Sequence, residues 1–270
     1  MQAHGKGAPL VADRVRVSVV IPVKNDSAEL ARCLAALASQ SRPADELIVV
    51  DNDSTDDSAR TAKAAGATVI SCVEPGIPAA SSRGYDAATG DLILRLDADC
   101  IPPTSWIDDV VSSFAARPDV SAFSGYARFI DGPAFLRTPL AVLYLLAYVV
   151  ATAPALGHRP LFGSNMAMRK EVWDAVGPTA HRDDPEVHDD MDLSFHLGER
   201  HRIRYFKSAA MGMSMRPFYS ATSFRRRTRR GLRTVAAHWP HDFPPRRWSR
   251  KITYALDARR TMTASSMNRG

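Results

Sequence analysis

The sequence predicts an α/β fold in which helices flank a central, mostly parallel mixed sheet, because strand and helix patterns alternate over its first hundred residues. Residues 92–96 are apolar except for one arginine, follow a glycine turn and precede two prolines, which indicates a short buried strand. Asp97 and Asp99 follow this strand directly. Side chains two residues apart in an extended chain point the same way, and at the carboxyl end of such a strand this direction is the ligand crevice.

The repeated units each begin with a strand. Four runs of aliphatic residues bounded by turn-forming residues are expected as strands: residues 15–22, 46–50, 67–72 and 92–96. Between them, helical spacing predicts residues 28–40, a helix capped by Ser54 or Thr55 that runs to about Ala65, and residues 79–89. This alternation forms βαβ units with parallel strands. Asp51 and Asp97, which end two of the strands, are therefore expected on one rim of the sheet.

Composition indicates a soluble globular protein, since 45% of the 270 residues are hydrophobic and 24% are charged. Cys33, Cys72 and Cys100 lie far apart without metal-ligand spacing, which fits a reducing compartment. Residues 1–14 are polar and hold no apolar run of the signal-peptide type, so we expect a flexible N-terminus and no export. These features together predict a cytoplasmic protein.

Positive charge is concentrated near the C-terminus. Residues 216–270 contain 14 Arg or Lys against 2 Asp or Glu, whereas the whole chain has a net charge of only +6. A basic segment of this kind can meet anionic lipid, nucleic acid or an acidic polymer. Residues 225–230 are nearly all arginine, without the interleaved aromatic residues that stack on bases, so no nucleic-acid partner is expected.

An uncharged run, Pro139–Leu156, is just long enough to cross a membrane. One crossing here would leave Asp97 and Asp99 on one side of the bilayer and Asp190 on the other, and no second run returns the chain. The run is therefore expected either as a core helix or as a helix that lies shallowly on a membrane. The second alternative predicts peripheral contact with the anionic inner face of the cell membrane.

Two groups of acids are candidates for chemistry. The oxygens of Asp97 and Asp99 suit Mn²⁺ or Mg²⁺ held together with substrate phosphates, although such acids also cap turns. Asp189 and Asp190 precede a predicted helix over residues 191–199, where the helix dipole alone favours acids. An inverting group transfer needs a base for the acceptor hydroxyl and positive charge on the leaving diphosphate, which these two groups can supply.

These segments, in this order, resemble the family 2 glycosyltransferases, whose GT-A fold is a Rossmann-like nucleotide-sugar-binding fold. The segments that carry the resemblance are residues 19–25, 48–56, 90–99, 162–169 and 189–194. The resemblance implies an inverting, metal-dependent transfer from a nucleoside diphosphate sugar, with UDP or GDP as the nucleotide. The acceptor is expected to be a hydroxyl or a lipid phosphate. The apolar run and the basic tail make a membrane-associated acceptor, such as a polyprenyl lipid or a nascent glycan of the cell envelope, the leading hypothesis.

The resemblance also implies roles for single residues. The implied donor-binding residues are Pro22, Val23, Asn25, Asp51, Asp53, Arg83, Asp97 and Ala98. Among these, the loop after Pro22 and Asp51 would hold base and ribose, while Arg83 would face the diphosphate. The metal ligands would be Asp99, with Asp97, and a late histidine, His238. In the catalytic pair Asp189–Asp190, the second acid would be the general base.

The sequence departs from the family pattern at several places. Asp51-Asn52-Asp53 replaces Asp-Asp-Gly, Arg83-Gly84 replaces Arg-Asn, and Asp189 stands where Glu is usual. The Gln-x-x-Arg-Trp element of processive relatives is degenerate around residues 224–231, which favours a single transfer. Within one domain we expect a donor half at 15–118, an acceptor half at 119–215 and a basic tail at 216–270.

Two other classes remain open at this stage. A sugar nucleotidyltransferase has a similar sheet but needs a glycine-rich phosphate loop after its first strand, and Pro22-Val23-Lys24-Asn25 has no glycine. A non-catalytic nucleotide-sugar-binding protein has the same binding residues without turnover. Loss of transfer with retained donor binding in an Asp190→Asn variant distinguishes an enzyme from such a protein.

Overall fold

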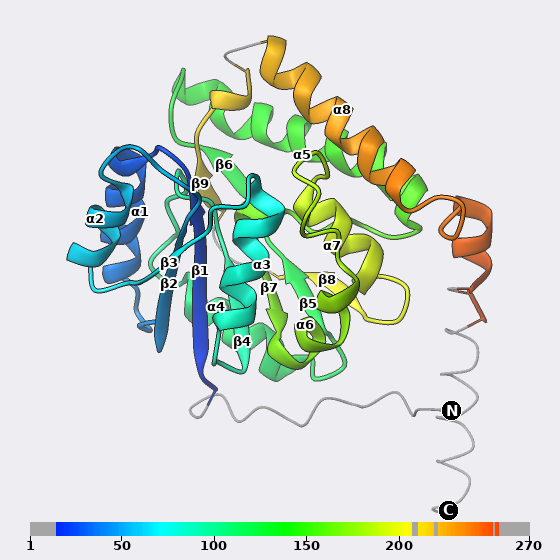
Figure 1. Cartoon of the computed structure of the whole chain (residues 1–270), viewed down its shortest axis with the longest axis horizontal. Coiled ribbons are helices and arrows are strands. Elements are labelled where there is room, and N and C mark those ends of the chain that lie inside the picture. The colour runs from blue at the N-terminus through cyan, green and yellow to red at the C-terminus, as the bar shows by residue number, and fades with distance from the viewer. Residues whose placement is uncertain (1–14, 207–209, 219–220, 251, 254–270) are drawn as a thin grey trace, which may run out of the picture.

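A seven-stranded mixed sheet organises the chain, in the strand order β3-β2-β1-β4-β7-β5-β8 (Figure 1). The computed structural model describes residues 15–206, 210–218, 221–250 and 252–253, so the expectation of a flexible segment at residues 1–14 lies outside the described residues. The strands are β1 (Val17–Val23), β2 (Glu46–Asp51), β3 (Thr68–Ser71), β4 (Leu92–Arg95), β5 (Ala122–Ser124), β6 (Ala127–Phe129), β7 (Met166–Arg169), β8 (Ile203–Tyr205) and β9 (Met211–Met213).

Helices alternate with strands from β1 to β5, as expected for βαβ units. The helices are α1 (Ser27–Ala38), α2 (Ser58–Ala64), α3 (Ile77–Ala87), α4 (Trp106–Ala116), α5 (Ala134–Leu156), α6 (Lys170–Val176), α7 (Asp189–Leu197) and α8 (Ala221–Ala237). Three short 3₁₀ turns are η2 (Gly163–Asn165), η3 (Gly177–Thr179) and η4 (Arg216–Phe218). The predicted α/β class and the helix-flanked sheet are confirmed.

One strand runs against the rest of the large sheet. The strands β3, β2, β1 and β4 are parallel, whereas β7 is antiparallel to both of its neighbours, β4 and β5. Strand β1 lies between β2 and β4, so Asp51 and Asp97 share a rim but are separated by one strand. The strands β6 and β9 form a separate parallel pair.

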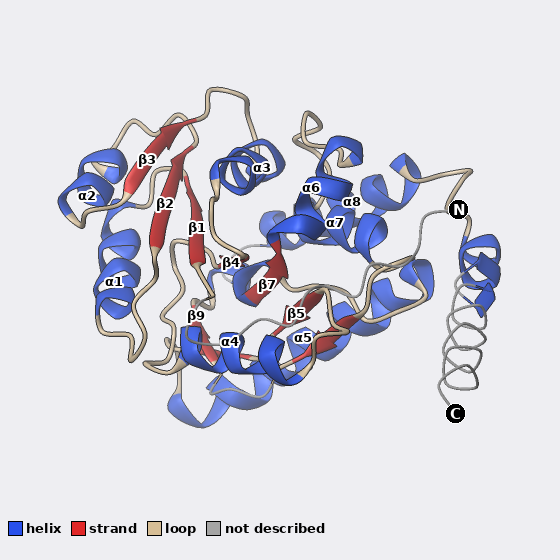
Figure 2. Cartoon of the chain, turned by 90° about the horizontal axis from the view of Figure 1, so that it is seen from below, coloured by secondary structure: helices blue, strands red, loops and turns tan. Residues whose placement is uncertain are grey.

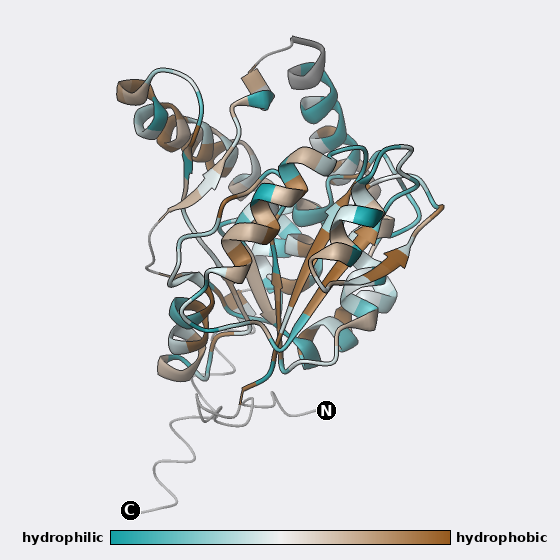
Figure 3. Cartoon of the chain, turned by 90° about the vertical axis from the view of Figure 1, so that its left-hand side faces the viewer, coloured by the Kyte–Doolittle hydropathy of each residue, from teal (hydrophilic) through white to brown (hydrophobic). Residues whose placement is uncertain are grey.

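The core consists of two layers, one on each face of the sheet. Val19 and Ile21 of β1 pack with apolar residues of α1 and α4, whereas Val20 packs with those of α3, α6 and α7. This alternation follows from the two-residue period of a strand that is buried on both sides. Figure 2 shows the two groups of helices on opposite faces of the sheet, and Figure 3 shows the strands as the most hydrophobic layer between them.

One local expectation is corrected. Neither Ser54 nor Thr55 caps α2, which begins at Ser58. Both residues instead join two loops: the Asn25 backbone N–H donates to Ser54 Oγ, and the Thr55 N–H donates to Asn25 Oδ1. All three cysteines are buried and free of disulfides.

Helix α5 is not a core helix, so the expectation of core burial is wrong. Of its 23 residues only Ala141, Thr152 and Leu156 are buried. Its exposed apolar side chains are Phe135, Val142, Leu143, Leu146 and Val150. Among the described residues, α5 is the one helix whose length and composition are sufficient to cross a membrane. The packed side carries Tyr144 and Tyr148, which lie against the core.

Candidate active site

A cleft of about 450 Å³ opens at the carboxyl ends of β1 and β4. The predicted site residues that line it are Pro22, Val23, Asp97, Ala98, Asp99, Asp189 and Asp190. Helix α5 contributes Tyr144 and Tyr148, and α8 contributes three arginines. Figure 1 shows both helices above the carboxyl ends of the strands, where ligands bind in sheets of this kind.

A buried arginine joins the two groups of acids. Arg95, the last residue of β4, is 3% exposed, and its Nη2 lies 2.8 Å from Asp97 Oδ1 and 3.3 Å from Asp189 Oδ2. Burial lowers the pKa of a guanidinium, but the charges of Asp97 and Asp189 raise the pKa of Arg95 above its ordinary value. Arg95 is therefore a permanent cation in the floor of the cleft, and it fixes the relative position of the two acids.

Asp99 lies beyond the carboxyl end of β4, beside a second arginine, Arg216. Its Oδ2 is 2.9 Å from Nη2 of Arg216, which also holds Asp26 through two nitrogens. Burial, followed by the charge of Asp97, raises the pKa of Asp99 to about 6, against the opposing effect of Arg216. Carboxylate oxygens of Asp97 and Asp99 lie within 4.8 Å of one another. Two hard oxygen donors at this spacing fit Mn²⁺ or Mg²⁺, which complete their shells with substrate phosphates and water.

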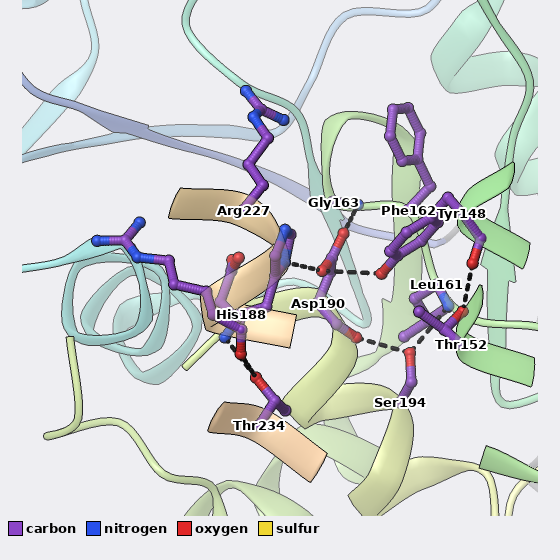
Figure 4. Close-up of polar contacts among 12 residues, drawn as sticks. Tyr148, Thr152, Leu161, Phe162, Gly163, His188, Asp190, Ser194, Arg227 and Thr234 are labelled. Atoms are coloured by element: carbon purple, nitrogen blue, oxygen red, sulfur yellow. Dashed lines mark hydrogen bonds and ion pairs between the residues drawn. The ribbon is translucent and has the colours of Figure 1, made fainter. Parts of the chain in front are cut away.

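Asp190 is held by three hydrogen-bond donors (Figure 4). Its Oδ1 accepts from Tyr148 Oη at 3.1 Å and lies 2.6 Å from His188 Nδ1, while its Oδ2 accepts from the Gly163 backbone N–H at 2.8 Å. Burial alone raises a carboxyl pKa, but the charge and hydrogen bond of His188, with the Gly163 N–H, lower the pKa of Asp190 to about 2. Asp190 is therefore an oriented anion at neutral pH.

Asp189 has the opposite environment. Burial, together with the charge of Asp190, raises the pKa of Asp189 in spite of Arg95. Its Oδ2 accepts a hydrogen bond from Ser81 Oγ at 3.3 Å. Asp189 and Asp190 both belong to the first turn of α7, where the positive end of the helix dipole favours negative charge. The same two carboxylates line the cleft.

The structure does not bring four of the expected donor-binding residues into the cleft. Asn25, Asp51, Asp53 and Arg83 do not line it. Asp51 is paired in register with Val23 at the rim, and its Oδ1 accepts from the Ser54 N–H at 3.3 Å. Arg83 forms a bidentate ion pair with Glu74, at 2.6 and 2.7 Å. Their contacts with base, ribose and diphosphate stay a prediction.

The expectation that His238 binds the metal ion together with Asp97 and Asp99 is corrected. It does not line the cleft, and its Nε2 lies 3.5 Å from Asp192 Oδ1 in a separate cluster. The physical reason is the direction of α8. The arginine-rich part of α8 lines the cleft, and the chain beyond it carries His238 against Phe195 of α7, where the two rings stack at a centroid distance of 4.0 Å.

A family model for glycosyl transferase family 2 matches residues 18–177. The chain belongs to this family. A glycosyltransferase of the archaeon Haloferax volcanii is 33% identical over 107 residues, which are 37% of this chain and 35% of that protein. The undecaprenyl-phosphate 4-deoxy-4-formamido-L-arabinose transferase of Klebsiella pneumoniae is 38% identical over 116 residues, 39% of this chain and 35% of that protein. The chain thus spans about a third of the length of these relatives.

Solved structures show the same fold. A mannosyltransferase from Pyrobaculum calidifontis, in complex with GDP-Man and Mn²⁺, superposes with a TM-score of 0.64 at 18% identity, over 97% of this chain and 82% of that one. Glucosyl-3-phosphoglycerate synthase from Mycobacterium tuberculosis, in complex with Mn²⁺, UDP and phosphoglyceric acid, has a TM-score of 0.64 at 23% identity, over 88% of this chain and 83% of that one. The family 2 chain therefore has the GT-A fold.

Several cleft residues of this family 2 domain were missed by the sequence analysis. Ser164 donates a hydrogen bond to Asp97 Oδ2, Arg216 pairs with Asp99, and Tyr148 and His188 contact Asp190. These partners lie in the 3₁₀ turns η2 and η4, in the loop before α7 and on α5, and only Ser164 belongs to a segment of the family resemblance. For Arg95 the sequence does hold a signal, since a single arginine inside an apolar strand indicates a buried charge with a partner.

The arginine run of α8 takes part in the cleft. Arg226, Arg227 and Arg230 line it, and Arg227 Nη1 donates to Tyr144 Oη at 3.1 Å. The same helix holds the loop before α7, because Arg233 lies 3.0 Å from Asp184 and the His188 N–H donates to Thr234 Oγ1 at 2.8 Å. The cleft therefore has acids on its floor and a basic helix along one wall.

Proposed function

We propose that this family 2 domain is an inverting glycosyltransferase. It transfers a sugar from a UDP- or GDP-linked donor to a hydroxyl or lipid-phosphate acceptor and uses Mn²⁺ or Mg²⁺. The observation that carries the proposal is that Asp97, Asp99, Asp189 and Asp190 line one cleft, in which Arg95 pairs with both Asp97 and Asp189. Family membership and neighbours with bound nucleotides and Mn²⁺ support it.

The proposed division of labour follows from the contacts of the acids. Asp99 and Asp97 hold the divalent ion, which supplies positive charge to the leaving diphosphate when bound. Asp190 accepts the proton of the acceptor hydroxyl, which in a lipid phosphate is the P–OH group of the monoanion, since Asp190 is ionised and its carboxylate is oriented by Gly163 and Tyr148. Pro22 and Val23 at the end of β1 line the part of the cleft that would hold the nucleotide.

A donor panel tests this proposal. Calorimetric titrations with UDP, GDP and TDP, and with their sugars, are carried out with and without Mn²⁺. We expect one nucleotide to bind at least tenfold more tightly with the metal than without it, and an Asp99→Asn variant to lose this difference. An exposed control, Asp174→Asn, keeps it. Equal binding with and without metal contradicts the proposed metal site.

For the acceptor we propose a lipid phosphate, presented at the inner face of the cytoplasmic membrane for cell-envelope glycan or glycolipid synthesis. Helix α5 exposes Leu143 and Leu146, at 61% and 56%, whereas Arg226 and Arg227 of α8 line the cleft. An apolar face suits acyl chains, and guanidinium groups suit a phosphate. The resemblance to an undecaprenyl-phosphate sugar transferase supports this acceptor class.

Vesicle co-sedimentation tests the membrane part of the proposal. The protein is mixed with phosphatidylglycerol vesicles at physiological salt, and with neutral phosphatidylcholine vesicles for comparison. We expect a Leu143→Asp, Leu146→Asp double variant to bind the anionic vesicles at least tenfold more weakly. Val73→Asp, which changes a residue that is 71% exposed outside α5, is the matched control. Unchanged binding by the double variant, or no binding by the parent, favours a soluble acceptor.

A further inference from the structure

Three histidines and one aspartate form a cluster outside the cleft, around α7, the helix whose first turn carries Asp189 and Asp190. His181 precedes α7, Asp192 and His196 belong to it, and His238 follows α8. The ligand atoms of all four residues lie within 4.8 Å of one another. We propose that these residues bind one Zn²⁺ ion in a structural site, separate from the site at Asp97 and Asp99.

Asp192 Oδ1 is the common point of the cluster. It lies 2.7 Å from His181 Nδ1, 3.6 Å from His196 Nε2 and 3.5 Å from His238 Nε2. Ligand atoms around a tetrahedral zinc ion are separated by about 3.3 Å, given metal–ligand distances of about 2.0–2.1 Å. Two of the three contacts are thus already close to this separation, and only His181 Nδ1 needs to move outward.

The three imidazole rings surround one point. Their centroids are 5.6 Å apart for His181 and His196, 4.8 Å for His181 and His238, and 5.1 Å for His196 and His238. A tetrahedral ion with zinc–nitrogen distances of about 2.0–2.1 Å holds imidazole centroids about 5 Å apart. The rings therefore have the separation that a shared ion requires.

Hydrogen bonds behind two of the rings set their tautomers. His238 Nδ1 lies 2.8 Å from the Thr234 carbonyl oxygen, which can only accept, so Nδ1 carries the proton. His196 Nδ1 lies 3.1 Å from Thr179 Oγ1, and that hydroxyl already donates to the Val176 carbonyl, so Nδ1 donates here too. In the neutral tautomer with the proton on Nδ1, each Nε2 atom presents a lone pair. Such outer hydrogen bonds are usual for histidines that bind metals.

The inward nitrogens have no hydrogen-bond partner. The Nε2 atoms of His196 and His238 are buried and unpaired, and the His238 side chain is only 3% exposed. In the tautomer with the proton on Nδ1, the Nε2 lone pair of His238 faces the Asp192 carboxylate at 3.5 Å, which repels it. A cation between the two groups removes this repulsion.

The donor set selects the metal. Three neutral imidazoles and one carboxylate suit Zn²⁺, whereas Mg²⁺ and Mn²⁺ prefer oxygen ligands. Four protein ligands close the coordination shell, which is typical of a structural ion. The ion would join the loop before α7, α7 itself and the chain after α8, and so fix Asp190 relative to the arginines of the cleft wall.

Metal analysis of the purified protein tests the proposal. The chain is prepared without a polyhistidine tag, zinc is measured by mass spectrometry, and Co²⁺ replaces it for absorption spectra. We expect about one zinc per chain and intense tetrahedral Co²⁺ bands. His196→Ala and Asp192→Asn should weaken Zn²⁺ binding at least 100-fold. The control His241→Ala, at an exposed histidine outside the cluster, and Asp99→Asn in the cleft should both retain the zinc.

Thermal unfolding provides a second measurement that does not depend on activity. A zinc chelator should lower the melting temperature of the parent and of Asp99→Asn, and should leave His196→Ala unchanged. Circular dichroism confirms that each variant is folded. The proposal is overturned if the parent holds no zinc, shows no tetrahedral Co²⁺ spectrum and melts identically with and without chelator. In that case the four residues form only a hydrogen-bonded network around Asp192.

Discussion

The carboxylates of Asp97 and Asp189 share one guanidinium, that of Arg95. Arg95 Nη2 lies 2.8 Å from the first and 3.3 Å from the second, and its side chain is almost completely buried. The strand that carries the proposed metal ligands is thereby connected to the helix that carries the proposed base. A change at Arg95 should consequently affect both stability and transfer.

Replacing Arg95 by Met removes the buried cation and leaves the partly buried Asp97 and Asp189 without their partner. We expect the free energy of unfolding to fall by about 3–5 kcal/mol, as for other buried pairs that lose one member. Urea unfolding followed by circular dichroism measures this change. The matched control is Arg32→Met, which removes an exposed pair with Glu29 and should cost less than about 1 kcal/mol. Equal losses in both variants would contradict the role of Arg95.

Asp190→Asn should abolish transfer and leave donor binding intact. The amide keeps the size of the side chain but cannot accept the acceptor proton, so we expect kcat to fall by about 10²–10⁴-fold. Initial rates with the donor found in the calorimetric panel measure the change, and calorimetry checks binding. If Asp189→Asn causes the larger loss, the base is the first acid of the pair, whose pKa is raised by burial.

His188→Gln should move the acid limb of the activity profile to higher pH. Burial opposes a charged His188, but the charge and hydrogen bond of Asp190 outweigh burial and raise its pKa. The pair therefore stabilises the fold below the unfolded His pKa, about 6.5, and this contribution is lost as pH rises through the folded pKa. Without His188 the pKa of Asp190 should rise from about 2 toward its ordinary value of about 3.9.

The pH dependence of kcat/KM measures this shift. The control His241→Ala changes an exposed histidine outside the Asp190 network and should leave the profile in place. A His188→Gln profile that coincides with that of the parent would show that Asp190 does not set the acid limb.

The presence and the parallel direction of the first four strands could be predicted because each is marked locally, by apolar runs and turn residues. The antiparallel strand β7 could not, since its pairing with β4 and β5 is decided by distant partners. In the site, acids at strand and helix ends were readable from position alone. The exposure of α5 could not be predicted, because an apolar run has the same sequence pattern whether the helix packs in the core or lies at the surface. His238 could be recognised from its residue type as a potential metal ligand, but its position in the fold depends on the direction of α8.

Gly163→Ala should damage the site through a single methyl group. A Cβ atom at this position would lie 1.7 Å from Arg95 Nη1 and 3.3 Å from Asp190 Oδ2, and Arg95 has no room to retreat because it is buried. We expect a loss of about 1–3 kcal/mol in unfolding free energy, as in other overpacked interiors, and a loss of transfer that exceeds the loss of donor binding.

Gly231→Ala is the matched control, because a Cβ atom there meets nothing within 4 Å in the middle of α8. Alanine is the better helix former, so this variant should gain about 0.5–1 kcal/mol. Urea unfolding and initial rates on the two variants give the comparison. Because the same substitution should have opposite signs at the two sites, a stable and active Gly163→Ala protein would mean that Arg95 and Asp190 do not meet the backbone of residue 163 as closely as their contacts indicate.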